Sequence, residues 1–321
     1  MNILYMLYKC YKKFIPIMIL GLVISTSLTV PVSAGETSDV SFYLWRLINN
    51  ARRNPVNVLS TMGFDIPSVR LALANRSWIL DLEQGLPPLA WNPQLFDSSM
   101  AHNQDMIKHL YYSYVSRDGS TYMDRIERAG YSAQIAGETL GIVSFEYYIE
   151  PVEAANLIFR NMLKDEIDPL SRVERNILNP DVTEIGISFS ATPFEFPQMS
   201  LLNVYLVVID FAKPIENHSY VIGNFYEEND SGIHPIQDLK ELGLVIRFLP
   251  EGIDVPLFFL PMAGFQFEVS SGFFFIEVRD VLGRVIARRS GQGICTNQLI
   301  DLKLINTVVP VTPDIPRYFL Q

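Results

Sequence analysis

The spacing of hydrophobic positions divides the chain into a helical part and a part built from strands. Up to residue 180, apolar side chains recur every three or four residues, as they do on one face of a helix. This spacing predicts helices over Asp39–Arg53, Ser68–Leu73, Thr121–Ala129 and Pro151–Asp165, and one more helix that begins at Pro93.

The helix that begins at Pro93 has the clearest start signal. Asn92 is a favoured N-cap residue, and proline is tolerated in the first turn because its missing N–H would have no partner there. One stripe of this helix, at alternating steps of four and three, comprises Leu95, Ser99, His102, Met106 and His109. The stripe predicts that His102 is a partly buried histidine with a hydrogen-bonded partner, rather than a ligand-binding one.

After residue 180 the apolar residues are mainly β-branched and aromatic. Glu184–Phe189 and Leu202–Phe211 are predicted strands, and the second is apolar enough to be central in its sheet. Helices around a short sheet indicate an α/β domain that ends near Lys213-Pro214. Beyond it, closely spaced short strands indicate a small all-β sandwich. They are Ser219–Tyr226, Gly243–Leu249, Pro256–Leu260, Gly264–Val269, Phe273–Arg279, Val285–Arg289 and Gln298–Leu304.

The first 34 residues have the layout of an export signal. Lys9, Lys12 and Lys13 precede an uncharged run, and Val32-Ser33-Ala34 supplies the small residues that a signal peptidase needs. We predict cleavage after Ala34, no membrane-spanning segment in the mature chain, and a secreted or periplasmic location. The alternative is a retained anchor, because the apolar run is near the lower length limit for crossing a bilayer.

Charge and cysteine content restrict the partners. Without its first 34 residues the chain changes its formal charge from −10 to −13, which disfavours nucleic acid and anionic membranes as partners. Cys295 is then the only cysteine, so no internal disulfide is expected, and we predict a small buried or half-buried side chain there. The acidic sequence Glu227–Gly232 predicts a solvated turn, with a loose calcium site as the alternative.

Six sequence blocks between residues 86 and 211 resemble the bacterial branch of the CAP superfamily (cysteine-rich secretory proteins, antigen 5, pathogenesis-related 1). They are LPPLAWNP, AHNQDM, RDGSTYMDRIERAGY, AGETLG, ERNILNP and TEIGISF, in that order. The resemblance implies a three-layer α/β/α sandwich. The following all-β sandwich resembles Cna-B-like or prealbumin-like modules. We therefore predict a signal peptide (1–34), a CAP domain (35–213), a β-sandwich module (214–306) and a C-terminal tail (307–321).

The resemblance also implies a cleft that holds two histidines and two glutamates in complete family members. Mapped onto this chain, Tyr114 takes the first histidine position and Glu138 keeps the first carboxylate. Val173 or Glu174 stands at the second histidine position, and Glu166 is the candidate for the second carboxylate. A phenol and carboxylates without imidazole make a poor transition-metal site, so we expect neither a metal nor another cofactor.

A plainer structural role is the alternative for these residues. Tyr114 and Glu138 would then hydrogen-bond each other across the cleft, and Asp124 and Arg125 would form ion pairs on a helix surface. His102 is retained among the candidate cleft residues because the family also has a histidine there, although not as one of the cleft pair.

Two functions follow from the resemblance. The preferred one is an exported, non-catalytic protein that binds a lipid-like or sterol-like ligand, or a protein partner, against an aromatic cleft wall of Tyr111, Tyr112 and Tyr114, with Tyr147 and Tyr148 nearby. The alternative is an extracytoplasmic, protease-like hydrolase, in which Glu138 acts with Glu166 or Glu174 as acid and base.

Overall fold

A computed structural model shows how this chain folds. It describes residues 34–74, 79–168, 170–171, 174–194, 202–216, 218–229, 232–235, 243–249, 258–260, 264–269, 272–279, 285–293 and 296–303. The predicted signal segment and Cys295 lie outside these ranges. The chain separates into two compact units, Met1–Asn217 and His218–Gln321. The first unit thus extends past residue 213, where the sequence predicted the domain limit.

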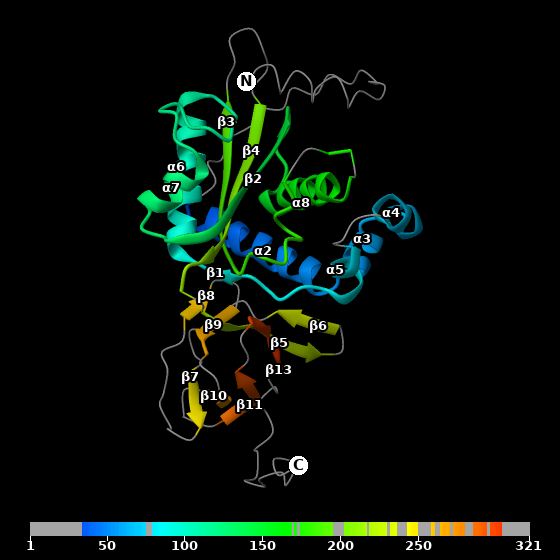
Figure 1. Ribbon diagram of the computed structural model, residues 1–321, viewed down its shortest axis with the longest axis vertical. Coiled ribbons are helices and arrows are strands. Elements are labelled where there is room, and N and C mark those ends of the chain that lie inside the picture. The colour runs from blue at the N-terminus through cyan, green and yellow to red at the C-terminus, as the bar shows by residue number, and fades with distance from the viewer. Residues whose placement is uncertain are drawn as a thin grey trace. The chain divides into compact units, whose positions relative to one another are not determined.

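The first unit has a four-stranded sheet between two layers of helices (Figure 1). The sheet order is β1-β3-β4-β2, with β1 parallel to β3 and the other pairs antiparallel. Its strands are β1 (Ala90–Trp91), β2 (Ala133–Phe145), β3 (Glu184–Phe194) and β4 (Leu202–Pro214). Together with the family assignment given below, this arrangement confirms the predicted α/β class.

Helices cover both faces of this sheet. Helix α6 packs on β3 and β4 and α7 packs on β2, while α2 and α8 pack on β3 and β2 from the opposite face (Figure 1). The helices of the first unit are α2 (Ala34–Arg53), α3 (Pro55–Thr61), α4 (Ile66–Leu73), α5 (Ile79–Gln84), α6 (Pro93–His109), α7 (Tyr122–Arg128) and α8 (Pro151–Ile167).

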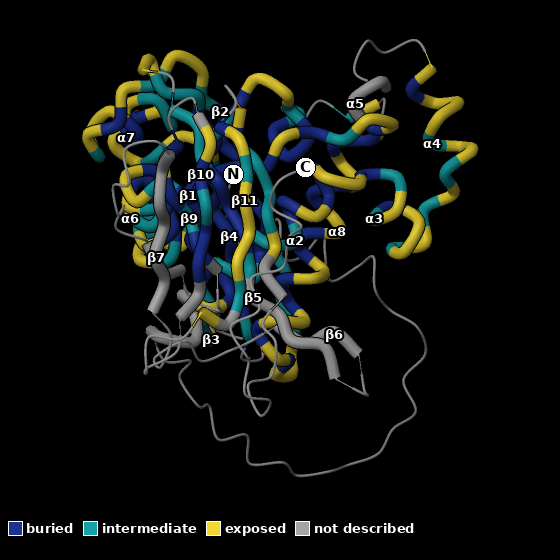
Figure 2. The backbone as a smooth tube through the Cα atoms, turned by 90° about the horizontal axis from the view of Figure 1, so that it is seen from below, coloured by how far each residue is buried: buried dark blue, intermediate teal, exposed yellow. Residues whose placement is uncertain are grey.

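The core between α6 and the sheet follows the alternation of side chains along the strands. Met106 of α6 packs against Leu140 of β2 and against Leu206 and Val208 of β4. Strand β4 is buried along most of its length, as its dark blue trace in Figure 2 shows, which agrees with its predicted central position. The predicted stripe of α6 faces the sheet, since four of its residues are fully buried: Leu95, Ser99, His102 and Met106.

Helix α6 crosses the sheet closely because β3 has a glycine beneath it. A Cβ atom at Gly186 would lie 2.1 Å from the backbone nitrogen of Phe96. The start of α6 is fixed as the sequence predicts, because the side chain of Asn92 accepts hydrogen bonds from the backbone of Gln94 (2.9 Å) and Leu95 (3.2 Å). These two constraints fix where α6 begins and how closely its first turn approaches β3.

The sequence missed strand β2 altogether. Gly137 and Gly141 interrupt its apolar pattern, yet a Cβ atom would lie 2.3 Å from Asn176 Oδ1 at the first glycine and 2.3 Å from Ile158 Cγ2 at the second. Glycine is therefore needed at both positions to let neighbouring side chains approach. Because glycine is not typical of strands, it also removes the residue pattern from which a strand could have been predicted. The sequence also missed the short helices α3 and α5, and placed the start of α2 at residue 39 instead of Ala34.

The second unit consists of two sheets. One has the order β11-β10-β7, and the other β12-β5-β9-β8 with β6 and β13 also paired to β5. Phe267 of β9 and Phe274 of β10 bring the sheets into contact, with ring centroids 5.6 Å apart. The strands are β5 (Tyr220–Asn229), β6 (Gly232–Pro235), β7 (Gly243–Leu249), β8 (Phe258–Leu260), β9 (Gly264–Glu268), β10 (Gly272–Arg279), β11 (Val285–Gly293), β12 (Gln298–Leu299) and β13 (Leu302–Lys303).

The acidic sequence after Tyr226 is not the open turn that we predicted. Strand β5 continues to Asn229, and Glu227, Glu228 and Asn229 pair with residues of β6 in an antiparallel hairpin. The side chains of this hairpin lie outside the described part. Among the residues that the structure describes, no helix has the length and apolar character needed to cross a membrane.

Candidate functional site

Glu138 lies at the centre of a buried polar cluster between α6 and the sheet. Its Oε1 atom accepts a hydrogen bond from Arg125 Nη2 at 2.7 Å and lies 2.9 Å from His102 Nδ1. Neither the Glu138 nor the His102 side chain is exposed, and only 5% of the Arg125 side chain is. Charged groups this deep in a protein need a partner of opposite charge, and Arg125 provides it for Glu138.

Arg125 also holds the segment that precedes its own helix. Its Nη1 atom donates to the Ser116 hydroxyl (2.9 Å) and to the Ser120 carbonyl (3.0 Å), and Nη2 donates to the Tyr114 carbonyl (3.1 Å). The prediction of a surface ion pair for this arginine was therefore wrong. Asp124, its neighbour, completes a capping box with Thr121 at the start of α7.

A second carboxylate stands beside Glu138 on the sheet. Asp210 of β4 is directly opposite Glu138 of β2 in the antiparallel register, so both side chains point to the α6 face. The Ser98 hydroxyl and the Glu138 carboxylate are its polar neighbours. Burial, followed by the adjacent charge of Glu138, raises the pKa of Asp210 well above its usual value. The protonated form of Asp210 is therefore favoured in the folded protein.

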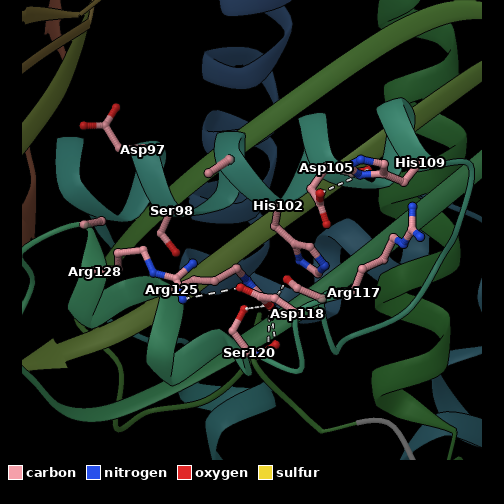
Figure 3. A pocket seen from close by; sticks show the side chains of 13 residues that line it. Asp97, Ser98, His102, Asp105, His109, Arg117, Asp118, Ser120, Arg125 and Arg128 are labelled. Atoms are coloured by element: carbon pink, nitrogen blue, oxygen red, sulfur yellow. Dashed lines mark hydrogen bonds and ion pairs between the residues drawn. The ribbon is translucent and has the colours of Figure 1, made fainter.

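A hollow of about 720 Å³ opens next to this cluster, between α6 and the segment that leads into α7 (Figure 3). Figure 3 shows His102 projecting from α6 toward the Asp118 turn, with Arg125 approaching from the other side. The lining side chains are mostly charged or polar: Asp97, Ser98, Ala101, His102, Asp105, His109, Ser116, Arg117, Asp118, Ser120, Arg125, Arg128 and Ala129. Glu138 lies behind this lining and is not part of it.

The hydrogen bond predicted between Tyr114 and Glu138 is absent from the structure. Oε1 of Glu138 is shared by His102 and Arg125, and Oε2 has no hydrogen-bond partner within the described ranges. Burial, followed by the nearby charges of Glu138, Glu174 and Asp165, raises the pKa of Tyr114. Tyr114 and Glu174 thus share the neighbourhood of Glu138, but both are exposed while Glu138 is sealed. Val173 lies outside the described residues.

Glu166 does not serve the cleft as the sequence predicted. Its Oε1 atom accepts hydrogen bonds from the backbone of Asn176 (2.8 Å) and Ile177 (2.6 Å), and Oε2 accepts one from Leu178 (3.0 Å). Burial raises its pKa to about 7, against the effect of these three N–H groups. Glu166 therefore fastens the 176–178 segment to α8, and both of its oxygens are already used.

The predicted aromatic wall is divided between the core and the surface. Tyr112 packs, partly buried, against Leu202 and Val204, and the hydroxyl of Tyr111 donates to Asp105. Tyr114 is exposed, and so are Tyr147, which contacts the ring of Phe145, and Tyr148, whose hydroxyl donates to Glu150 at 3.4 Å.

Metal binding has no obvious centre in the described part of the chain. No group of three or more histidine, cysteine, aspartate or glutamate side chains is arranged there to hold an ion. The imidazole of His102 does reach Glu138, contrary to the prediction that Glu138 has no histidine beside it. Glu138 is also paired with the guanidinium of Arg125, which already supplies a positive charge next to the carboxylate.

Comparison with known protein families agrees with this arrangement. The model of the cysteine-rich secretory protein family, CAP, matches residues 45–207. The chain belongs to this family. The match covers α6, α7, β2, α8 and β3 and the first part of β4, up to residue 207, and so includes every residue of the Glu138 cluster except Asp210. The chain matches none of the curated protein sequences.

Three solved structures are similar to the CAP unit of this chain. An extracellular SCP-domain protein from Bacillus anthracis str. Ames is 19% identical, with a TM-score of 0.34, over 58% of this chain and 45% of its own. A cysteine-rich secretory protein from Staphylococcus aureus is 10% identical, with a TM-score of 0.30, over 56% of this chain and 40% of its own. An outer surface protein from Borrelia burgdorferi is 18% identical, with a TM-score of 0.28, over 47% of this chain and 96% of its own. Because these scores are low, the family assignment depends on the family model alone.

Sequence reasoning missed Arg125 and Asp210 as members of the central cluster. Arg125 lies next to Asp124 on a short helix, and charged helix residues usually lie on the solvent-facing side. Asp210 is the one acidic residue inside the mainly apolar strand Leu202–Phe211. This exception to the apolar pattern could have identified Asp210 as a candidate site residue. An ionisable residue at such a position is rarely buried without a partner.

Proposed function

We propose that this CAP protein is an exported, non-catalytic binding protein, and that the hollow beside His102 and Arg125 receives its ligand. The observation that carries the proposal is the complete burial of Glu138 in its ion pair with Arg125. The export signal predicted at residues 1–34 supports a location outside the cytoplasm. The hollow has the size of ordinary small-molecule sites, which occupy roughly 300–1,000 Å³.

The hydrolase alternative receives less support from the same geometry. A general acid or base must come within hydrogen-bonding reach of the reacting group of its substrate. Glu138 is enclosed by His102 and Arg125, and both oxygens of Glu166 are occupied by backbone N–H groups. Glu174 is exposed, but it is then a single carboxylate without the second group that acid–base hydrolysis requires.

The lining of the hollow also bears on the kind of ligand. The family resemblance implied a lipid-like or sterol-like ligand, or a protein partner. A lipid tail would leave the charged side chains of the hollow without hydrogen-bonding partners, at a cost of about 1–3 kcal/mol for each buried group. A polar small molecule fits this lining better than an apolar one.

Native mass spectrometry of the full chain, recovered from the extracytoplasmic fraction of an expressing bacterium, tests the proposal. We expect a small-molecule adduct that survives gentle desalting and is lost in Ala101→Trp, because residue 101 lines the hollow and is exposed. Gln104→Trp is the matched control, since it is exposed on the same helix but does not line the hollow.

Two results would overturn the proposal. One is an adduct that persists unchanged in Ala101→Trp, or no adduct at all. The other is hydrolysis of casein or of p-nitrophenyl esters that disappears in Glu138→Gln, because the sealed carboxylate would then be a catalyst.

A further inference from the structure

The hollow between α6 and the 116–129 segment is lined by several charged side chains whose positive and negative charges balance. Three arginines line it, Arg117, Arg125 and Arg128, and so do the aspartates Asp97, Asp105 and Asp118. The formal charges of these six side chains cancel. A strongly anionic or cationic ligand therefore gains little from the overall field of the hollow, whereas a neutral ligand meets donors and acceptors side by side.

Two groups at the base of the hollow are left without hydrogen bonds. The Nδ1 atom of His102 is engaged by Glu138. The Nε2 atom of the same ring is buried and has no partner among the described residues, and the same is true of Arg125 Nε, a donor. Two buried nitrogen atoms thus remain without hydrogen bonds beside the hollow.

The rim carries two further charged groups, at opposite ends of the hollow (Figure 3). Arg117 and Asp97 are both exposed, and neither forms an ion pair in the part of the chain that the structure describes. Arg128, in contrast, pairs with Asp118 at 3.7 Å, and His109 pairs with Asp105 at 2.7 Å. Arg117 presents a planar fork of donors and Asp97 presents two acceptor oxygens.

A hydroxyl group is at once donor and acceptor, and two neighbouring hydroxyls match either a carboxylate or a guanidinium. A molecule that carries many hydroxyls on a neutral frame therefore satisfies the rim and the base together. We propose that the hollow is a saccharide-binding site, with Asp97 and Arg117 each hydrogen-bonding hydroxyls at its own end of the rim and His102 Nε2 hydrogen-bonding one at the base. This inference rests on the proposed function and specifies the class of its ligand.

Isothermal titration calorimetry of the full chain with cellobiose, maltose and N,N′-diacetylchitobiose tests the inference. We expect at least one of these disaccharides to bind. Asp97→Asn and Arg117→Ala should each weaken that binding by about tenfold, the usual effect of losing a hydrogen bond to a charged group. Both residues are exposed, so folding should be unchanged. The matched controls Asp181→Asn and Arg160→Ala, also exposed but away from the hollow, should bind as the parent does.

The saccharide inference and the proposed function fail in different ways. If none of the three disaccharides binds but native mass spectrometry shows an adduct that Ala101→Trp removes, the inference is wrong and the binding function stands. If a disaccharide binds equally to Asp97→Asn, Arg117→Ala and the parent, it binds elsewhere and the inference is also wrong. If the parent protein shows neither a small-molecule adduct nor disaccharide binding, both the proposed function and the saccharide inference are wrong.

Discussion

The Nδ1 atom of His102 lies 2.9 Å from Oε1 of Glu138, and neither side chain is exposed. Helix α6 supplies the histidine and strand β2 the glutamate, so the contact ties the helical layer to the sheet. The sequence predicted a glutamate without a neighbouring imidazole. The imidazole instead comes from the stripe of α6, and the guanidinium of Arg125 completes the cluster on the same oxygen at 2.7 Å.

Removing the cation from this cluster should destabilise the protein strongly. In Arg125→Met the Glu138 charge would remain buried without a partner, and the 114–120 segment would lose the three hydrogen bonds that fix it. We expect a loss of about 3–5 kcal/mol in the free energy of unfolding, measured by urea denaturation. The exposed Arg128→Met should change it by less than about 0.5 kcal/mol.

A second substitution checks that this loss comes from the unpaired charge. Adding Glu138→Gln to Arg125→Met removes the negative charge that the arginine neutralised. The double variant should therefore recover part of the lost stability. If it is as unstable as the sum of both single variants, the two side chains are not coupled and the ion pair is not what stabilises the cluster.

The protonation of Asp210 should make stability depend on pH. Because the pKa of Asp210 is raised in the folded state, the native protein keeps a proton that the unfolded chain releases. This contribution is fully present below the ordinary aspartate pKa and is lost as the pH rises through the raised value. Asp210→Asn should flatten the fall in unfolding free energy that begins as the pH rises above the ordinary aspartate pKa, by up to about 1.4 kcal/mol per pH unit. Equal slopes in parent and variant would show that Asp210 is ionised in the native state.

Glu166 should control the order of the segment after α8. Glu166→Gln replaces an acceptor by an NH₂ group, which cannot accept from the three backbone N–H groups as the carboxylate does. Hydrogen exchange at the amides of Ile177 and Leu178 should speed up by an amount equal to about 1–3 kcal/mol of lost protection. The exposed Glu174→Gln is the control, and its effect on these amides should be negligible.

The approach of α6 to the sheet gives a prediction about packing. In Gly186→Ala the new methyl group would meet the backbone of Phe96, which cannot rotate away as a side chain could. We expect a loss of about 2 kcal/mol or more in thermal or urea denaturation. A variant as stable as the parent would mean that α6 lies farther from β3 than the structure places it.

Much of the fold is predictable from the sequence because its signals are local. Asn92 and Pro93 mark the start of α6, and the run Leu202–Phe211 marks a central strand. Strand β2 is the exception, because Gly137 and Gly141 are selected by contacts with Asn176 and Ile158, which are distant in sequence. No local pattern contains that information.

The candidate site was harder to predict for the same reason. The family pattern pointed to Glu138, but it says nothing of which side chains enclose it. Arg125 and Asp210 reach Glu138 only through the pairing of α7 and β4 with β2. Glu166 was the candidate for the second carboxylate of the cleft. Instead it accepts hydrogen bonds from backbone N–H groups of residues 176–178, a contact that the sequence does not reveal.

Carboxylate footprinting tests the central claim, that Glu138 is sealed from any ligand or substrate. The native protein would be treated with a water-soluble carbodiimide and glycinamide, and labelling of each glutamate followed by mass spectrometry. We predict that Glu174 is labelled readily while Glu138 stays unlabelled until the protein unfolds. Labelling of Glu138 in the native protein at a rate similar to that of Glu174 would contradict the buried ion pair, and with it the assignment of a non-catalytic function.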